Sequence, residues 1–142
     1  MELITKMTAD GSRTLYIPQM DEQYHSLNGA VTESDYVYIN KGYLYNDRPE
    51  PFVLEIGFGT GLNCRLTAIQ AEKHKRPTSY IAMEKYPLDM KMIRELDYGN
   101  PISEKAAGLF TAIHKSGWDS FFSISPYFRL NKILADVTDK FK

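Results

Sequence analysis

The chain has a single cysteine, Cys64, among its 142 residues. One cysteine cannot form an intramolecular disulfide, which excludes the disulfide-stapled class of small secreted domains. No run of apolar residues reaches the roughly 20 needed to span a bilayer. The amino terminus, MELITKMTADG, also lacks the charged-then-apolar pattern of a signal peptide. We therefore expect a cytoplasmic protein that does not contact a membrane.

An excess of one charge is also lacking, because 17 Lys and Arg stand against 18 Asp and Glu, for a net charge of -1. No overall field then attracts nucleic acid, so an RNA substrate would have to meet a local basic patch. Hydrophobic residues make up 43% of the chain and aromatic residues 13%, which is ordinary for a folded core. The length predicts one folded domain.

Residues 1–50 are expected to form a β-rich extension with a lid-like loop. Glu2–Met7 and Arg13–Pro18 are β-prone and flank an Asp-Gly pair, which predicts an opening hairpin. The polar loop that follows is a candidate lid or substrate wall, although its composition is also typical of a plain surface connection. Its candidate residues are Tyr24, His25, Ser26, Gly29 and Glu33. Tyr36–Ile39 then predicts a strand.

The stretch Phe52–Asn63 is the one around which the rest of the chain is organised. Phe52–Ile56 is apolar with almost no alternation, which predicts a strand buried on both faces. Glycines then open a helix; they accept unusual dihedrals and let a ligand approach the backbone, while the helix start offers free N–H groups. A bare connection between strand and helix would also use glycines. The assignment of a cofactor turn therefore depends on the residues around them.

The glycine spacing indicates which cofactor is bound. Dinucleotide folds use Gly-x-Gly-x-x-Gly, but here Leu62 occupies the third glycine position and Gly61 comes one residue early. This spacing disfavours NAD. The pattern Glu55-x-Gly57-x-Gly59-x-Gly61 resembles motif I of class I S-adenosylmethionine-dependent methyltransferases.

Two more acids follow strands. Thr78–Glu84 is a predicted strand, and Glu84 is near the spacing at which nucleotide folds place a carboxylate on the ribose hydroxyls. Phe128–Ala135 is the third predicted strand of the sheet, followed directly by Asp136. Since parallel strands bind ligands at their carboxyl ends, both acids are expected near the glycine turn. Asp136 could equally cap the turn that follows.

The remaining pattern predicts helices between these strands. They run from Gly61 to a basic end at Lys73, Lys75 and Arg76, from Pro87 to about Leu96, and from about Ile102 to Ser116. The basic end is expected to be solvated or, alternatively, to meet phosphates. Trp118, Phe121 and Phe122 are expected as core aromatics in a loop.

The order of several motifs extends the resemblance to a narrower family. Tyr24-x-Ser26-x-x-Gly29, the motif I segment and Met83-Glu84-Lys85-Tyr86-Pro87-Leu88 together resemble the methyltransferase domain of bacterial tRNA 5-methylaminomethyl-2-thiouridine biosynthesis enzymes. The resemblance covers roughly residues 10–140. It implies an α/β, Rossmann-like class I methyltransferase fold, with three parallel strands in residues 51–142. It also implies methyl transfer from S-adenosylmethionine to the aminomethyl nitrogen of a wobble uridine in tRNA.

The resemblance implies a role for particular residues. The glycines pass under the methionine part of the cofactor and Glu55 organises its amino group. Glu84 binds the ribose, Asp136 accepts from the adenine amino group, and the backbone N–H of Val137 reaches a ring nitrogen. The full set of cofactor-binding candidates is Glu55, Gly57, Phe58, Gly59, Thr60, Gly61, Asn63, Glu84, Lys85, Asp136 and Val137. No catalytic residue and no metal ligand is predicted.

The chain departs from that family at its carboxyl end. The resemblance implies a fourth strand that ends in Asp-x-Phe-x-Pro, and this motif does not occur in the sequence. We therefore expect this chain to be the amino-terminal part of a longer enzyme and to be inactive by itself. Some relatives are fused to a flavin-dependent oxidase. Without a fourth strand, the strand carrying Glu55 would expose its second edge, and we expect self-association through it.

Three other functions stay open from the sequence. The same turn could serve a small-molecule methyltransferase, or a binding module without catalysis. The third is a nicotinamide-dependent oxidoreductase, and the glycine spacing is the one argument against it.

Overall fold

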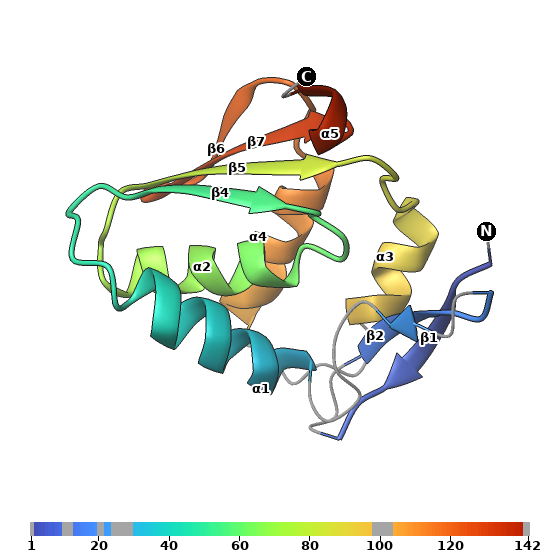
Figure 1. Cartoon of the computed structure of the whole chain (residues 1–142). Helices are drawn as coiled ribbons and strands as arrows, with labels where there is room; N and C mark the ends of the chain where they lie inside the picture. The colour runs from blue at the N-terminus through green and yellow to red at the C-terminus, as the bar shows by residue number, and fades with distance from the viewer. Residues whose placement is uncertain (1, 10–12, 20–21, 24–29, 98–103, 141–142) are drawn as a thin grey trace.

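The computed structural model describes residues 2–9, 13–19, 22–23, 30–97 and 104–140 (Figure 1). A four-stranded sheet in the order β4-β5-β7-β6 forms its main part. The strands β4 (Phe52–Ile56), β5 (Thr78–Glu84) and β7 (Phe128–Leu134) run parallel, as the sequence predicts. The fourth strand, β6 (Phe121–Ser125), is antiparallel to β7 and lies where the sequence predicted a loop.

One face of this sheet is covered by two helices, α2 (Leu62–Lys73) and α4 (Glu104–Lys115) (Figure 1). Alternation along the strands turns Tyr80, Phe128 and Leu130 toward the helices, where each is at most 2% exposed. The predicted inward positions Leu109, Phe110 and Ile113 of α4 are buried as well. The hydrophobic core therefore lies between this face and the two helices.

The other face of the sheet is open. Phe52, Leu54 and Ile56 of β4 are 60%, 55% and 52% exposed, so the expected burial of this strand on both faces is wrong. The run is apolar throughout, but β4 is an edge strand here, and no helix among the described residues covers its second face (Figure 1). Phe121 and Phe122 of β6 are 37% and 42% exposed, so they are not the core aromatics that were expected.

The chain opens with a small antiparallel sheet of β1 (Ile4–Met7), β2 (Arg13–Ile17) and β3 (Glu22–Gln23), which confirms the expected hairpin. The helix α3 (Met90–Asp97) lies beside it (Figure 1). Thr5 Oγ1 donates to Glu95 Oε2 at 3.5 Å across this contact. The last helix is the short α5 (Val137–Lys140).

The strand expected at Tyr36–Ile39 is a helix. The α-helix α1 (Ala30–Ser34) continues directly into a π-helix, η1 (Asp35–Tyr43), closed by a hydrogen bond from Leu44 N–H to Ile39 O at 2.8 Å. Ile39 and Tyr43, one turn apart, are buried, and the Tyr43 hydroxyl bonds Thr78 Oγ1 at 2.8 Å. Packing of this one stripe against the sheet layer outweighs the β propensity of the aromatic and branched residues.

No helix within the described residues is long and apolar enough to cross a membrane.

Candidate functional site

The three glycines after β4 form a tight loop at the carboxyl end of the sheet. Gly57, Gly59 and Gly61 have φ of +85°, +55° and +76°, a region that residues with a Cβ avoid. Met83 O, near the end of β5, accepts from Gly57 N–H at 2.8 Å and from Phe58 N–H at 3.0 Å. These bonds fold the loop back across the ends of β4 and β5, and α2 starts directly after it.

The surroundings of the glycines differ. A Cβ on Gly61 would lie 2.9 Å from Phe58 Cζ and 3.1 Å from the His114 ring, so close packing under the loop also requires this glycine. A Cβ on Gly57 would meet nothing within 4 Å. Gly57 therefore leaves its backbone open to an approaching group, while Gly61 closes the loop against the core.

Glu84, the last residue of β5, is in direct contact with this loop. Its Oε2 accepts from Gly59 N–H at 2.9 Å, and its Oε1 accepts from Tyr86 N–H at 3.2 Å. A carboxylate offers about four lone-pair positions, so these two bonds leave room for two more donors. The structure thus places the predicted ribose-binding acid beside the glycine turn.

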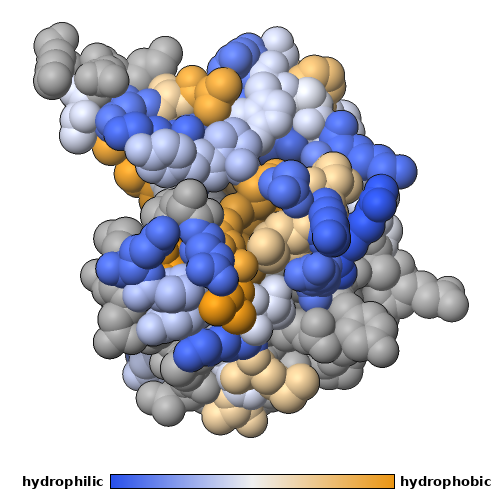
Figure 2. Space-filling model, turned by 90° about the vertical axis from the view of Figure 1, so that its right-hand side faces the viewer, coloured by the Kyte–Doolittle hydropathy of each residue, from blue (hydrophilic) through white to orange (hydrophobic). Residues whose placement is uncertain are grey.

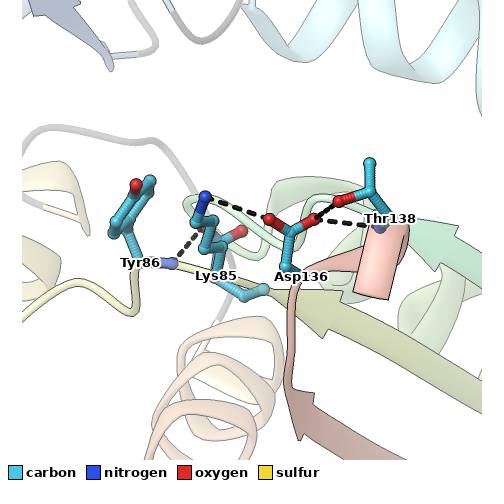
Figure 3. A network of polar contacts seen from close by, with 5 residues as sticks. Lys85, Tyr86, Asp136 and Thr138 are labelled. Carbon is cyan, nitrogen blue, oxygen red and sulfur yellow. Dashed lines mark hydrogen bonds and ion pairs between the residues drawn. The ribbon is translucent and has the colours of Figure 1, made fainter. Parts of the chain in front are cut away.

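Asp136 follows β7, the next strand along this edge, and Ala135 N–H donates to Glu84 O at 3.1 Å between the two strand ends. Its Oδ2 pairs with Lys85 Nζ at 3.0 Å (Figure 3). Its Oδ1 accepts from Thr138 N–H at 2.9 Å and Thr138 Oγ1 at 2.7 Å. Asp136 therefore caps α5, one of the two roles the sequence left open, and one lone-pair position is still available.

This pairing shifts the ionisation of both side chains. Hydrogen bonds from Thr138 and then Lys85 lower the pKa of the Asp136 carboxyl to about 2, and the same contact with Asp136 raises the pKa of Lys85. Asp136 is thus an anion over the whole physiological range, held at the end of β7 by two neighbours.

Glu55 lies on the helix-covered face of β4, between Asn63 of α2 and Tyr80 of β5. Burial raises the pKa of its carboxyl to about 7, hydrogen bonds from Asn63 and Tyr80 partly counter this, and the charge of Glu84 adds to it. Glu55 Oε1 and Asn63 Oδ1 have no hydrogen-bond partner among the described residues. Both line a cavity of about 640 Å³ beside Gly57 and Gly59. Two polar atoms without partners at a glycine loop are suited to a polar ligand group.

Three residues that support the site were not predicted from the sequence. Tyr80 bonds Glu55. The His114 ring packs edge-on against Phe58, with 5.7 Å between ring centroids, and burial and then the Lys132 charge lower its pKa to about 4. Lys132 is 1% exposed and donates to Ile113 O at 2.8 Å. Alternation in β7 could have predicted that Lys132 faces the helices with Phe128 and Leu130, whereas no local pattern indicates His114.

The other predicted residues are placed as follows. Phe58 and Thr60 are buried within the loop, Val137 begins α5, and Glu33 of α1 lines the same cavity as Glu55. Tyr24, His25, Ser26 and Gly29 lie outside the described residues. Among the described residues, no group of three or more His, Cys, Asp or Glu could hold a metal ion.

Figure 2 looks at the side of the molecule where the parallel strands end, and hydrophobic residues are gathered there in a recess flanked by hydrophilic ones. Parallel strands with a positive-φ glycine loop at their carboxyl ends, and carboxylates at or just after the ends of the next two strands, define a Rossmann-like α/β protein, a class in which ligands bind at this edge of the sheet. The residues fit a cofactor that carries an amino group, a ribose and a base, since unpaired acceptors remain at Glu55, Glu84 and Asp136.

Comparison with known proteins gives a narrower match. The chain is similar to the tRNA 5-methylaminomethyl-2-thiouridine biosynthesis bifunctional protein MnmC of Magnetococcus marinus, with 39% identity over 83 residues. The match covers 54% of this chain and 12% of that protein. The resemblance read from the motifs is thereby confirmed.

A solved structure shares the fold. The crystal structure of MnmC2 from Aquifex aeolicus matches with a TM-score of 0.73 and 23% identity, over 98% of this chain and 44% of that one. This confirms the predicted α/β fold. The chain therefore spans less than half of either of these two proteins. No protein-family model matches it.

Proposed function

We propose that the chain is the cofactor-binding part of an S-adenosylmethionine-dependent methyltransferase that acts on the aminomethyl group of a modified wobble uridine in tRNA. Residues 51–142 would hold the cofactor, and residues 1–50 would form an extension beside the substrate. The observation that carries the proposal is the 2.9 Å hydrogen bond from Gly59 N–H to Glu84. It joins the glycine loop of β4 to the acid of β5, as a shared nucleoside site requires.

In this proposal, each part of the site binds a different part of the cofactor. The open backbone at Gly57 and Gly59 would lie under the methionine part, and Glu55 would accept from its amino group. The two remaining lone-pair positions of Glu84 suit a pair of ribose hydroxyls, and the one at Asp136 suits the adenine amino group. When bound, the cofactor would supply an activated methyl group. The chain's own contribution is to orient the cofactor and exclude water around it.

The similarity to MnmC supports tRNA as the substrate, and a fused or partner flavin-dependent oxidase and a cytoplasmic location belong to the same proposal. None of the described residues is assigned as the catalytic base, so the acid beside the acceptor amine is expected elsewhere in the working enzyme.

Calorimetry tests the cofactor. We expect S-adenosylmethionine and S-adenosylhomocysteine to bind and NADH not to bind. Glu84→Gln should weaken binding about 10- to 100-fold, since lost hydrogen bonds to a charged group cost about 1.5–3 kcal/mol. The control is Glu50→Gln, an exposed carboxylate in the loop before β4. Tighter binding of NADH, or equal binding by wild type and Glu84→Gln, would overturn the cofactor assignment.

The substrate needs a separate assay. A longer protein that carries this chain is incubated with labelled cofactor and either undermodified tRNA or small amines. Label on the wobble uridine supports the proposal. Label only on small amines would make it a small-molecule methyltransferase, and cofactor binding without transfer to either would make it a binding module.

A further inference from the structure

The imidazole ring of His114 lies against the inner side of the glycine loop. His114 belongs to the last turn of α4 and is 9% exposed. Its ring centroid is 5.7 Å from that of Phe58, and a Cβ on Gly61 would lie 3.1 Å from its Cε1 and Nε2 atoms. The ring also packs against Phe110, one turn earlier in α4, with 4.5 Å between ring centroids. The ring is therefore enclosed between its own helix and the loop.

A hydrogen bond joins this ring to the loop. Burial and then the charge of Lys132 lower the pKa of His114 to about 4, while a hydrogen bond with the Thr60 backbone opposes that shift. A bond that opposes it stabilises the protonated ring, so the ring is the donor and the Thr60 carbonyl oxygen is the acceptor. His114 Nε2 has no hydrogen-bond partner among the described residues, which leaves Nδ1–H as the donor. The neutral ring thus holds its proton on Nδ1 and directs it at the loop.

The Thr60 carbonyl belongs to the peptide unit that closes the turn of the loop. This unit also contains the Gly61 N–H, which donates to Phe58 O at 2.9 Å. The carbonyl and the N–H of a trans peptide lie in one plane and point in opposite directions. The two hydrogen bonds therefore hold the Thr60–Gly61 peptide from both sides, directly before the first residue of α2.

Lys132 of β7 fixes the helix end that carries the ring. Its side chain is buried, and Nζ donates to Ile113 O at 2.8 Å and to His114 O at 3.4 Å. A positive charge is favourable there, because the last carbonyl groups of a helix have no partner within the helix. The backbone of His114 is thus tied to the sheet, which keeps its side chain under the loop.

We propose that His114 is a positioning residue for the cofactor, whose Nδ1–H holds the Thr60 carbonyl and so keeps the glycine loop in the shape in which Gly59 N–H meets Glu84. This inference rests on the proposed function, because the loop and Glu84 form the proposed nucleoside site. The contact at stake is the 2.9 Å hydrogen bond from Gly59 N–H to Glu84 Oε2. Without the ring donor, the Thr60 carbonyl would lose its partner beside the core, and the peptide would turn to find another.

Two substitutions of nearly the same shape separate the hydrogen bond from the packing. An Asn side chain can place its amide nitrogen where the ring has Nδ1, so His114→Asn keeps a donor for Thr60 O. His114→Leu places a methyl group there and has no donor. Both variants lack the outer ring atoms and lose their packing against Phe58. Leu109→Ala, at a buried position of the same helix, is the control for lost packing alone.

Calorimetry and urea unfolding should rank the two variants in opposite orders. We expect His114→Leu to bind S-adenosylhomocysteine about 3- to 10-fold more weakly than His114→Asn, as the loss of one hydrogen bond predicts. His114→Leu should nevertheless unfold at the same or a higher urea concentration, because leucine is easier to bury than an amide and is the better helix former. Leu109→Ala should unfold at a lower urea concentration than wild type and bind equally well. A merely structural role of His114 would make binding follow stability.

Two NMR measurements test the hold on the loop without any cofactor. Nitrogen-15 spectra of the wild-type imidazole, assigned with His114→Asn, should show a proton on Nδ1 and none on Nε2 at neutral pH. Hydrogen exchange at the Gly59 and Gly61 amides should be about 10-fold faster in His114→Leu than in His114→Asn, because the loop opens more often.

These readouts keep the inference distinct from the proposed function. A wild type that does not bind S-adenosylhomocysteine would overturn the proposed function, while the imidazole spectra and the exchange rates would still report whether His114 holds the loop. The role of His114 is overturned by a proton on Nε2, by equal exchange in the two variants, or by equal binding in His114→Leu and His114→Asn.

Discussion

At the scale of single residues, Gly57 and Gly61 of the same loop have different structural roles. Gly57 and Gly61 share a positive φ, but only Gly61 packs against Phe58 and His114. Both positions thus require the positive-φ backbone. At Gly61 the missing side chain allows close packing against the core, and at Gly57 it leaves the backbone open to the surface.

Alanine substitutions separate these tasks. We expect Gly61→Ala to lower the free energy of unfolding by about 3 kcal/mol, from backbone strain and overpacking together. Gly57→Ala should cost about 1 kcal/mol, from strain alone, and should abolish cofactor binding. Urea unfolding measures the first effect and calorimetry the second. Gly108→Ala, in α4 with no neighbour within 4 Å, is the control and should be stabilising by up to about 1 kcal/mol. Equal costs at Gly57 and Gly61 would contradict the distinction.

Two buried groups should give opposite pH dependence. The carboxyl of Glu55 has its pKa raised from 4.5 to about 7, so the folded state holds the extra proton and stability falls as pH rises across that window. His114 has its pKa lowered from 6.5 to about 4, so the unfolded state holds the extra proton and stability rises from about pH 4 to 6.5. Each slope is about 1.4 kcal/mol per pH unit at most.

The two slopes nearly cancel in the wild type between about pH 4.5 and 6.5. Glu55→Gln should leave the rise due to His114, and His114→Gln should leave the fall due to Glu55. Urea unfolding at half-unit pH steps measures both. Parallel pH profiles for the two variants would show that these groups do not titrate as described.

At the scale of elements, Arg76 connects the end of α2 to the loop before β4. Its guanidinium donates to the backbone oxygens of Tyr43, Asn46 and Arg48 at 2.7–2.9 Å. It also lies 4.5 Å from the centre of the Tyr43 ring. The basic helix end was expected to be solvated or to meet phosphates, but this arginine holds η1 and the loop in place.

We expect Arg76→Ala to destabilise the fold by about 2–3 kcal/mol, because three carbonyl groups lose a charged donor. Arg76→Lys should recover only part of this, since a lysine lacks the planar fork that reaches several oxygens at once. Lys73→Ala, at an exposed position of the same helix, should change stability by less than about 0.5 kcal/mol. Thermal and urea unfolding measure all three. A similar loss for Arg76→Ala and Lys73→Ala would exclude the bridging role.

At the scale of the whole molecule, the layer that usually covers the second face of a parallel sheet is missing from the described residues. Helices α2 and α4 cover one face, and the apolar face of β4 stays exposed (Figure 1). Parallel sheets are usually covered on both faces, so burial of this apolar face would add to stability.

The local sequence pattern predicted the elements that are formed by residues close together in the chain. The hairpin, the unit of β4, glycine loop and α2, and the strands ending at Glu84 and near Asp136 were all predicted, because turn glycines and apolar periodicity act within a few residues. Since parallel strands end at one edge, the meeting of Glu84 with the loop also follows from the sequence order.

The sequence by itself determined which segments are strands of the parallel sheet and which of their ends carry acids. Only the tertiary structure decided that 30–43 is helical, that Phe121–Ser125 adds a strand, that His114 lies under Gly61, and that Asp136 pairs with Lys85. The physical reason is that burial belongs to the neighbours of a segment rather than to the segment. An apolar strand such as β4 reads the same whether its second face is covered or open.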